Sequence, residues 1–204
     1  MQVEARIISS LSDSRTTERL SVFIDGRDPD GIDDLAWVVV EFPRDGLGWR
    51  LEGETLHYRQ SDSRHWFGSD QLTVPGTSEL PRGTLRIILG DLSGRTATRE
   101  VTLPPGRAPE DRRSYPRLRR DSASRSVVLE TVRVQSRHYL VSGERRLEVR
   151  FPESPSGTAP GSAPGVSGFE LPQEALQPFA NEPLWVIVEW SPSLWLEWGP
   201  WDHR

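Results

Sequence analysis

The chain has 204 residues, of which 35% are hydrophobic and 27% are charged, and its formal net charge is −5 at pH 7. Recurring aromatic and β-branched clusters exclude a disordered chain, and the length allows one large domain or two small ones. The absence of cysteine excludes disulfides and thiolate metal sites. The negative charge argues against nucleic acid as the main partner, and no apolar run is long enough for a membrane-spanning helix.

Residues 1–4 lack the charged region and the following apolar region of a signal peptide. We therefore expect a cytoplasmic protein, or a periplasmic or cell-surface protein if a leader has been removed.

Residues 1–104 alternate between apolar and polar side chains over short stretches that are separated by turn residues. This pattern predicts an all-β fold, and about seven strands in about 100 residues is the size of an immunoglobulin-type sandwich. Residues 35–42 are almost continuously apolar, which predicts a central strand covered on both faces. The strands expected here are residues 3–7, 20–24, 35–42, 49–51, 56–58, 72–74, 85–89 and 96–103.

Two segments of this region resemble bacterial immunoglobulin-like domains. Residues 22–40 carry Asp-Pro-Asp-Gly-Ile between two apolar strands, which is similar to the corner between the second and third strands of those domains. Residues 80–95 run from a Gly-led strand into an Asp-x-x-Gly turn, which is similar to their closing hairpin. The resemblance implies an immunoglobulin-like β-sandwich over about residues 1–104, and it implies no function because this fold has many roles. The overall layout also resembles proteins of spirochaetes.

The loop after the second expected strand is a candidate calcium site. Hard cations need several oxygen ligands, and closely spaced carboxylates with a glycine for the turn can supply them. The alternative is that Asp-Pro and Asp-Gly are simply good turn formers. The candidate ligands are Asp25, Asp28, Asp30, Asp33 and Asp34.

Residues 105–125 contain prolines, seven arginines and three acidic residues, and they lack apolar periodicity, so they are predicted to be a linker. Arg113 and Arg117 match the Arg-x-x-x-Arg half of the motif of PilZ domains, and this resemblance implies cyclic di-GMP binding. The second motif of that family is not matched, because Ala123 stands where it needs serine.

Residues 126–204 are predicted to form a small β-rich domain. Strands are expected at 126–134, 139–141 and 146–151, followed by a mobile low-complexity loop at 152–168. One short helix is expected at 171–176. A tryptophan-rich terminal hairpin is expected from strands at 184–190 and 194–198.

The hairpin carries the main candidate binding site. Because side chains alternate between faces of a strand, Trp185 and Glu189 share a face with Trp195 and Glu197, while the other face is aliphatic. Exposed rings beside carboxylates anchor protein partners and also stack on sugars. The alternative is that these rings cover the sheet as part of the core. The candidate binding residues are Trp185, Glu189, Trp195, Glu197 and Trp201.

No motif in the sequence indicates catalysis. The four histidines are scattered, there is no nucleophile elbow, and a phosphate-binding loop is excluded because every basic residue is arginine. The sequence therefore predicts a non-enzymatic module without a resident cofactor, except for the calcium considered above. A protein is the expected partner, with carbohydrate and then cyclic di-GMP as alternatives.

Overall fold

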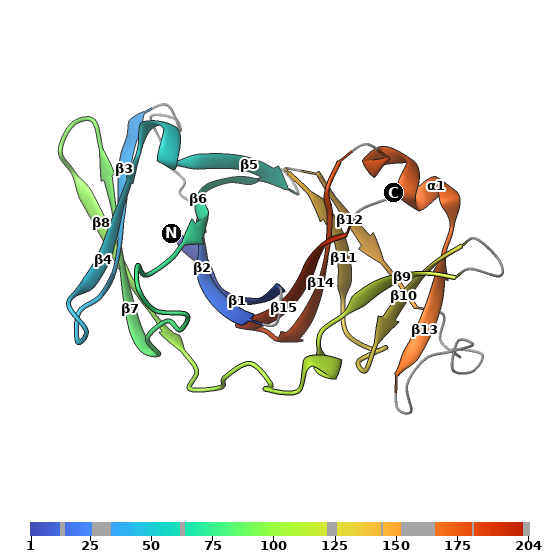
Figure 1. Cartoon of the computed structure of the whole chain (residues 1–204). Coiled ribbons are helices and arrows are strands. Elements are labelled where there is room, and N and C mark those ends of the chain that lie inside the picture. Colours follow the sequence, from blue (N-terminus) through green and yellow to red (C-terminus); the bar gives the residue numbers. More distant parts are fainter. Residues whose placement is uncertain are drawn as a thin grey trace. The chain divides into compact units, whose positions relative to one another are not determined.

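The structure, a computed structural model, describes residues 1–12, 15–25, 34–61, 64–121, 126–143, 145–151, 166–180 and 182–201. Over these residues the chain consists of strands, three 3-10 turns and one short α-helix (Figure 1), which confirms the predicted all-β class. The elements are β1 (Gln2–Ser12), β2 (Arg15–Asp25), β3 (Leu35–Phe42), β4 (Leu47–Glu52), η2 (Gly53–Thr55), β5 (His57–Ser61), β6 (Arg64–Leu72), β7 (Gly83–Asp91), β8 (Thr96–Leu103), η3 (Arg112–Ser114), β9 (Arg117–Arg120), β10 (Val127–Thr131), β11 (His138–Ser142), β12 (Arg145–Val149), β13 (Ser167–Leu171), α1 (Gln173–Leu176), η4 (Gln177–Phe179), β14 (Leu184–Ser191) and β15 (Leu194–Trp201).

The chain divides into two compact units whose boundaries differ from those expected from sequence. The first unit contains Met1–Ile8 and Glu18–Gly106, and the second contains Ser9–Thr17 and Arg107–Arg204. Strands β1 and β2 are each 11 residues long, and each contributes residues to both units. Local alternation revealed only five residues of each strand, so the sequence pattern could not show this division.

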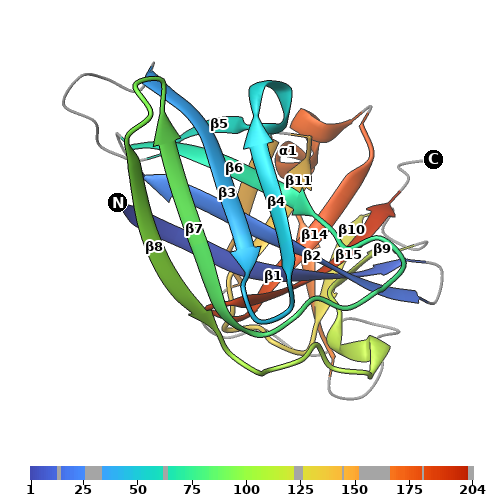
Figure 2. The ribbon, with the colours of Figure 1, turned by 90° about the vertical axis from the view of Figure 1, so that its left-hand side faces the viewer.

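The first unit is a two-layered β-sandwich. One layer is the sheet β4-β3-β7-β8, and the other contains the neighbouring strands β1-β2-β6-β5. Figure 2 shows the first sheet in front, with β1, β2 and β6 crossing behind it. Val38 and Leu85 from the first layer and Val22 and Phe67 from the second are fully buried. Each such apolar side chain contributes about 1.5–3 kcal/mol when it is removed from water.

Strand β3 lies between β4 and β7, as expected for a central strand, but only one of its faces is covered. Val38, Val40 and Phe42 are buried, whereas Trp37 and Val39 on the opposite face are half-buried. The expectation of burial on both faces was wrong. An uninterrupted apolar run is ambiguous, because the outward side chains of a strand can also be apolar.

The second unit also has two layers around one core. One layer contains β12-β11-β14-β15 and, next to β15, the end of β1 that belongs to this unit. The other layer is the three-stranded sheet β13-β10-β9, followed by α1 and η4. The buried core residues are Leu118, Val127, Leu129, Leu140, Val149, Leu171, Phe179, Leu184 and Val186.

The segment predicted to be a linker contributes to this core instead. It contains η3 and the strand β9, and Tyr115 and Leu118 within it are buried. The hydroxyl of Tyr115 lies 2.8 Å from the Ser9 hydroxyl. The linker prediction failed because β9 has only four residues, which is too short for a periodic pattern. Residues 152–165 of the predicted loop lie outside the described residues, and its end forms β13 instead.

Candidate functional site

The structure places four of the predicted binding residues on one face of the terminal hairpin. Ile187 lies opposite Glu197, and Glu189 lies opposite Trp195, so the period-two assignment of faces holds. Trp185 and Glu189 are half-buried, but Trp195 is 5% exposed and Glu197 is 6% exposed. The expected accessible platform is therefore wrong for Trp195 and Glu197.

Trp195 is packed into a cluster of aromatic and cationic side chains. Its ring stacks on that of Tyr139, with the ring centroids 5.3 Å apart and the planes at 14°. The guanidinium carbon of Arg146 lies 3.6 Å from the Tyr139 centroid and 4.5 Å from the Trp195 centroid. Ser10 Oγ donates a 2.6 Å hydrogen bond to Glu197. These contacts lie within the second unit, and they give Trp195 and Glu197 structural roles.

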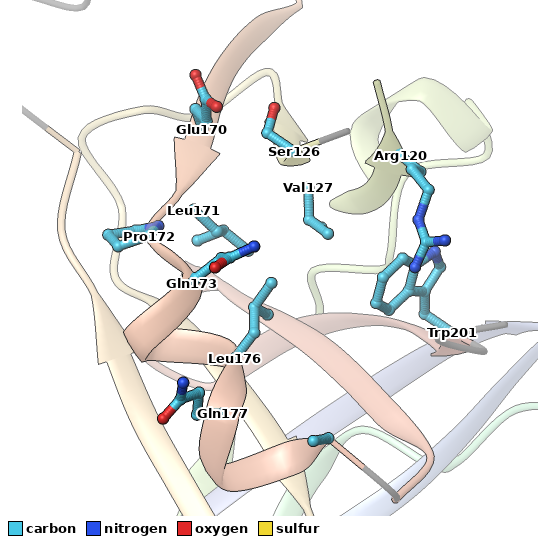
Figure 3. A pocket seen from close by; sticks show the side chains of 11 residues that line it. Arg120, Ser126, Val127, Glu170, Leu171, Pro172, Gln173, Leu176, Gln177 and Trp201 are labelled. Atoms are coloured by element: carbon cyan, nitrogen blue, oxygen red, sulfur yellow. The ribbon is translucent and has the colours of Figure 1, made fainter. Parts of the chain in front are cut away.

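A groove at one end of the three-stranded sheet is a candidate binding site in the second unit. Its volume is about 730 Å³, within the size range of ligand sites. Val127 pairs with Arg120 on one side and with Leu171 on the other, so three strands end at the same level. The chain then continues from β13 into α1 and η4, which form one wall of the groove, and Trp201 at the end of β15 contributes to the other (Figure 3).

The two walls of the groove differ in chemistry. Arg120 lies against Trp201 on one side, with its guanidinium carbon 6.0 Å from the ring centroid, which is within the range of a cation–π contact (Figure 3). Gln173 and Gln177 lie on the other side, one helical turn apart, and Gln173 directs its amide toward the groove. Glu170 lies at the rim of the groove.

The floor between the walls is apolar. It contains the buried side chains of Val127 and Leu171 and the half-buried side chain of Leu176. The groove can therefore hold an apolar group on its floor, an anionic group beside Arg120, and hydrogen-bonding groups against the glutamines.

Of the predicted binding residues, only Trp201 lines this groove. Sequence reasoning included Arg120 in the arginine-rich segment but took that segment for a linker, so it did not connect Arg120 with Trp201. It also missed Gln173 and Gln177, because the helix expected at 171–176 ends before Gln177 and was not examined as a binding surface. Trp201 also packs against the core, so it is partly structural.

The acidic loop proposed as a calcium site is described only in part. Asp28, Asp30 and Asp33 lie outside the described residues. Asp25 is buried, with a carboxylate oxygen 3.9 Å from Arg64 Nε, and the backbone carbonyl of Asp34 accepts a hydrogen bond from the loop after β7. Within the described ranges, no group of three or more acidic or histidine side chains is arranged to hold a metal. Calcium binding at this loop stays a prediction.

The arginine-rich segment makes local structural contacts. Arg113 N donates a hydrogen bond to Asp111, which caps η3, and Arg117 Nη2 donates to the Arg112 carbonyl. Arg119 Nε lies 3.0 Å from Glu130 on the neighbouring strand. Ser122–Arg125 lie outside the described residues. Cyclic di-GMP binding through Arg113 and Arg117 therefore stays a prediction.

His138 on β11 is fully buried, and its environment suppresses its charge. Burial lowers its pKa to about 4, opposed only by the backbone of Ser136. Its Nε2 lies 3.1 Å from Thr131 Oγ1, and its ring lies 4.8 Å from that of Phe151. The histidine is thus held neutral inside the second unit.

We expect the free energy of unfolding to fall as the pH is lowered from about 6.5 to about 4. The unfolded chain binds a proton at His138 near pH 6.5, whereas the folded chain resists this proton until about pH 4. The stabilisation is complete above pH 6.5, and its loss by pH 4 is about 3 kcal/mol. Urea denaturation at a series of pH values should show a shallower dependence for His138→Gln than for wild type. Equal slopes in this window would contradict the assignment.

No protein-family model and no curated sequence matches the chain. Among the described residues, no helix is both long enough and apolar enough to cross a membrane.

Proposed function

We propose that the chain is a non-enzymatic binding module and that its groove binds a short extended segment of a partner protein. The observation that carries this proposal is the pair of Arg120 and Trp201 beside an apolar floor. Arginine and tryptophan in a partly enclosed pocket are the residue types that dominate the energetics of protein interfaces. Arg120 and Glu170 are the titratable side chains of the described lining, which favours recognition over acid–base chemistry.

The groove selects the chemistry of the segment. An apolar side chain would occupy the floor, an acidic side chain would pair with Arg120, and the amides of Gln173 and Gln177 would hydrogen-bond to its backbone. Glu170 at the opposite rim disfavours a segment with acidic residues on both sides of the apolar one.

Selection from a library of displayed short peptides tests this function. Wild type should enrich sequences with an acidic residue close to an apolar one, and Arg120→Glu should weaken the binding of those peptides at least about tenfold by calorimetry. Gln173→Arg should also weaken binding by crowding the groove. The matched control is Arg150→Glu, since Arg150 is 84% exposed and does not line the groove. Enriched peptides that bind Arg120→Glu and wild type equally would refute the proposal.

Carbohydrate is the second candidate ligand, because a tryptophan facing amide side chains across a groove is also typical of sugar sites. A glycan array distinguishes the two: hits that are lost in Arg120→Glu and in Gln173→Arg, without peptide enrichment, would favour carbohydrate. For the first unit, the immunoglobulin-like relationship is part of the same proposal, supported by its two-layered sandwich.

A further inference from the structure

The outer face of the sheet β4-β3-β7-β8 in the first unit is an ordered grid of side chains. Figure 2 shows this face toward the viewer, with no other strand of the first unit in front of it. The strand registers align its outward residues in three rows. Across β4, β3, β7 and β8, the rows read Glu52, Trp37, Gly90, Thr96, then Arg50, Val39, Ile88, Thr98, then Gly48, Glu41, Arg86, Glu100.

The centre of the grid consists of apolar side chains that protrude little from the sheet. Val39 and Ile88 lie opposite each other and are half-buried. The ring of Trp37 lies across Gly90, since a Cβ built on that glycine would be 2.2 Å from the ring atom Cε2. The guanidinium of Arg50 lies over the same ring, 4.7 Å from its centroid. The result is an apolar centre between charged margins, which is the anatomy of a protein interface.

We propose that this face binds a second copy of the chain in a symmetric dimer. The two-fold axis would run parallel to the strands, between β3 and β7, so that β3 packs on β7 of the second copy. Each row of one copy then packs against the same row of the second copy, with its four residues in the opposite order. Val39 packs on Ile88 of the second copy. Glu41 and Arg86, which form an ion pair within each chain, also face each other across the axis, twice per dimer.

Charge selects this arrangement. With the axis parallel to the strands, Arg50 meets Thr98, Glu52 meets Thr96 and Glu100 meets Gly48, so no two like charges are opposed. With the axis across the strands through the middle row, Arg50 would lie on Arg50 of the second copy and Trp37 on Glu41. Like charges buried against each other are costly, so only the first axis makes the face self-complementary.

The size of the face predicts a weak dimer. Four strands about 4.8 Å apart and three rows about 7 Å apart cover roughly 20 Å by 20 Å, which is below the roughly 800 Å² per partner of a standard interface. We expect a dissociation constant in the micromolar range.

Sedimentation equilibrium over a range of protein concentrations tests the dimer. Wild type should show a concentration-dependent dimer, and Arg86→Glu and Glu41→Arg should each weaken it at least about tenfold, because like charges then face each other. An equimolar mixture of these two variants should form a heterodimer, since both charged positions are acidic in one variant and both are basic in the other. The double variant E41R/R86E should dimerise like wild type, because the exchange restores opposite charges across the axis.

Glu54→Arg is the matched control, because Glu54 is exposed in η2 and lies outside the three rows. Thermal unfolding of each variant excludes loss of the fold as the cause of dissociation. A wild-type chain that stays monomeric at millimolar concentration would overturn the proposal. A dimer that is indifferent to both charge reversals would overturn it as well, and so would a mixture of the two single variants that forms no heterodimer. Because the groove lies in the other unit, peptide binding reports on the proposed function separately.

Discussion

Replacing Gly68 with alanine is expected to destabilise the first unit by about 4 kcal/mol or more. Gly68 lies on β6 opposite Phe23 of β2. A Cβ at this position would be 1.8 Å from the Val22 carbonyl oxygen and 2.9 Å from the Phe23 Cα atom. Both atoms belong to the backbone, so no side-chain rotation can make room, and β2 must move away from β6.

This movement would disturb the core directly, because Val22 and Phe67 beside the contact are fully buried. The register of β2 and β6 already shifts between Leu20 and Val22, and the glycine is what allows the Val22 carbonyl to approach β6 so closely.

Chemical denaturation followed by tryptophan fluorescence measures the loss. The matched control is Gly106→Ala in the same unit, where an added Cβ meets nothing within 4 Å. The control should change the free energy of unfolding by less than about 0.5 kcal/mol. If Gly68→Ala unfolds at the denaturant concentration of wild type, the close approach of β2 is incorrect.

Replacing Glu18 with glutamine is expected to cost about 3 kcal/mol or more. Glu18 Oε1 and Oε2 accept hydrogen bonds from Arg82 at 2.7 and 3.0 Å, and Oε2 also accepts one from the Leu80 backbone N–H at 3.0 Å. Only 6% of the Glu18 side chain and 15% of the Arg82 side chain are exposed. The amide would leave the Arg82 charge buried without a counter-ion and would direct N–H donors at it.

The pair also holds the segment between β6 and β7, because Arg82 donates to the Leu80 carbonyl and Glu18 N donates to the Ser78 carbonyl. Loss of the carboxylate should therefore increase hydrogen exchange in residues 78–82 as well as lower stability.

Glu52→Gln provides the same chemical change in an exposed ion pair of the same unit. Glu52 and Arg50 are 58% and 53% exposed and 2.8 Å apart, so this control should cost less than about 1 kcal/mol. Equal losses for Glu18→Gln and Glu52→Gln in denaturant titrations would show that burial does not determine the strength of the first pair.

Local patterns were sufficient to place most strands. The terminal hairpin was predicted with its faces correctly assigned, because alternation is a property of neighbouring residues on one strand. The short helix was predicted for the same local reason. By contrast, β9 and β13 were missed, and β6 was recognised only at its last residue, because glycine and polar side chains interrupt its apolar pattern.

Burial was the property that alternation could not decide. Trp195 lies on a strand face that sequence reasoning identified, and Trp37 lies in a run expected to be covered on both faces. Trp195 is 5% exposed, whereas Trp37 is half-buried on an open face. The difference depends on which other strands contribute side chains to that face. The immunoglobulin-like relationship stays a prediction, since a two-layered sandwich is common to many families.

By itself, the sequence determined the all-β class, the hairpin and the alternation of faces, because these depend on residues that are neighbours along the chain. Only the tertiary structure decided that Arg120 meets Trp201, that Glu18 binds Arg82 and that Gly90 lies under Trp37. These contacts join residues that are distant in sequence, and strand order and register, which no local pattern specifies, bring them together.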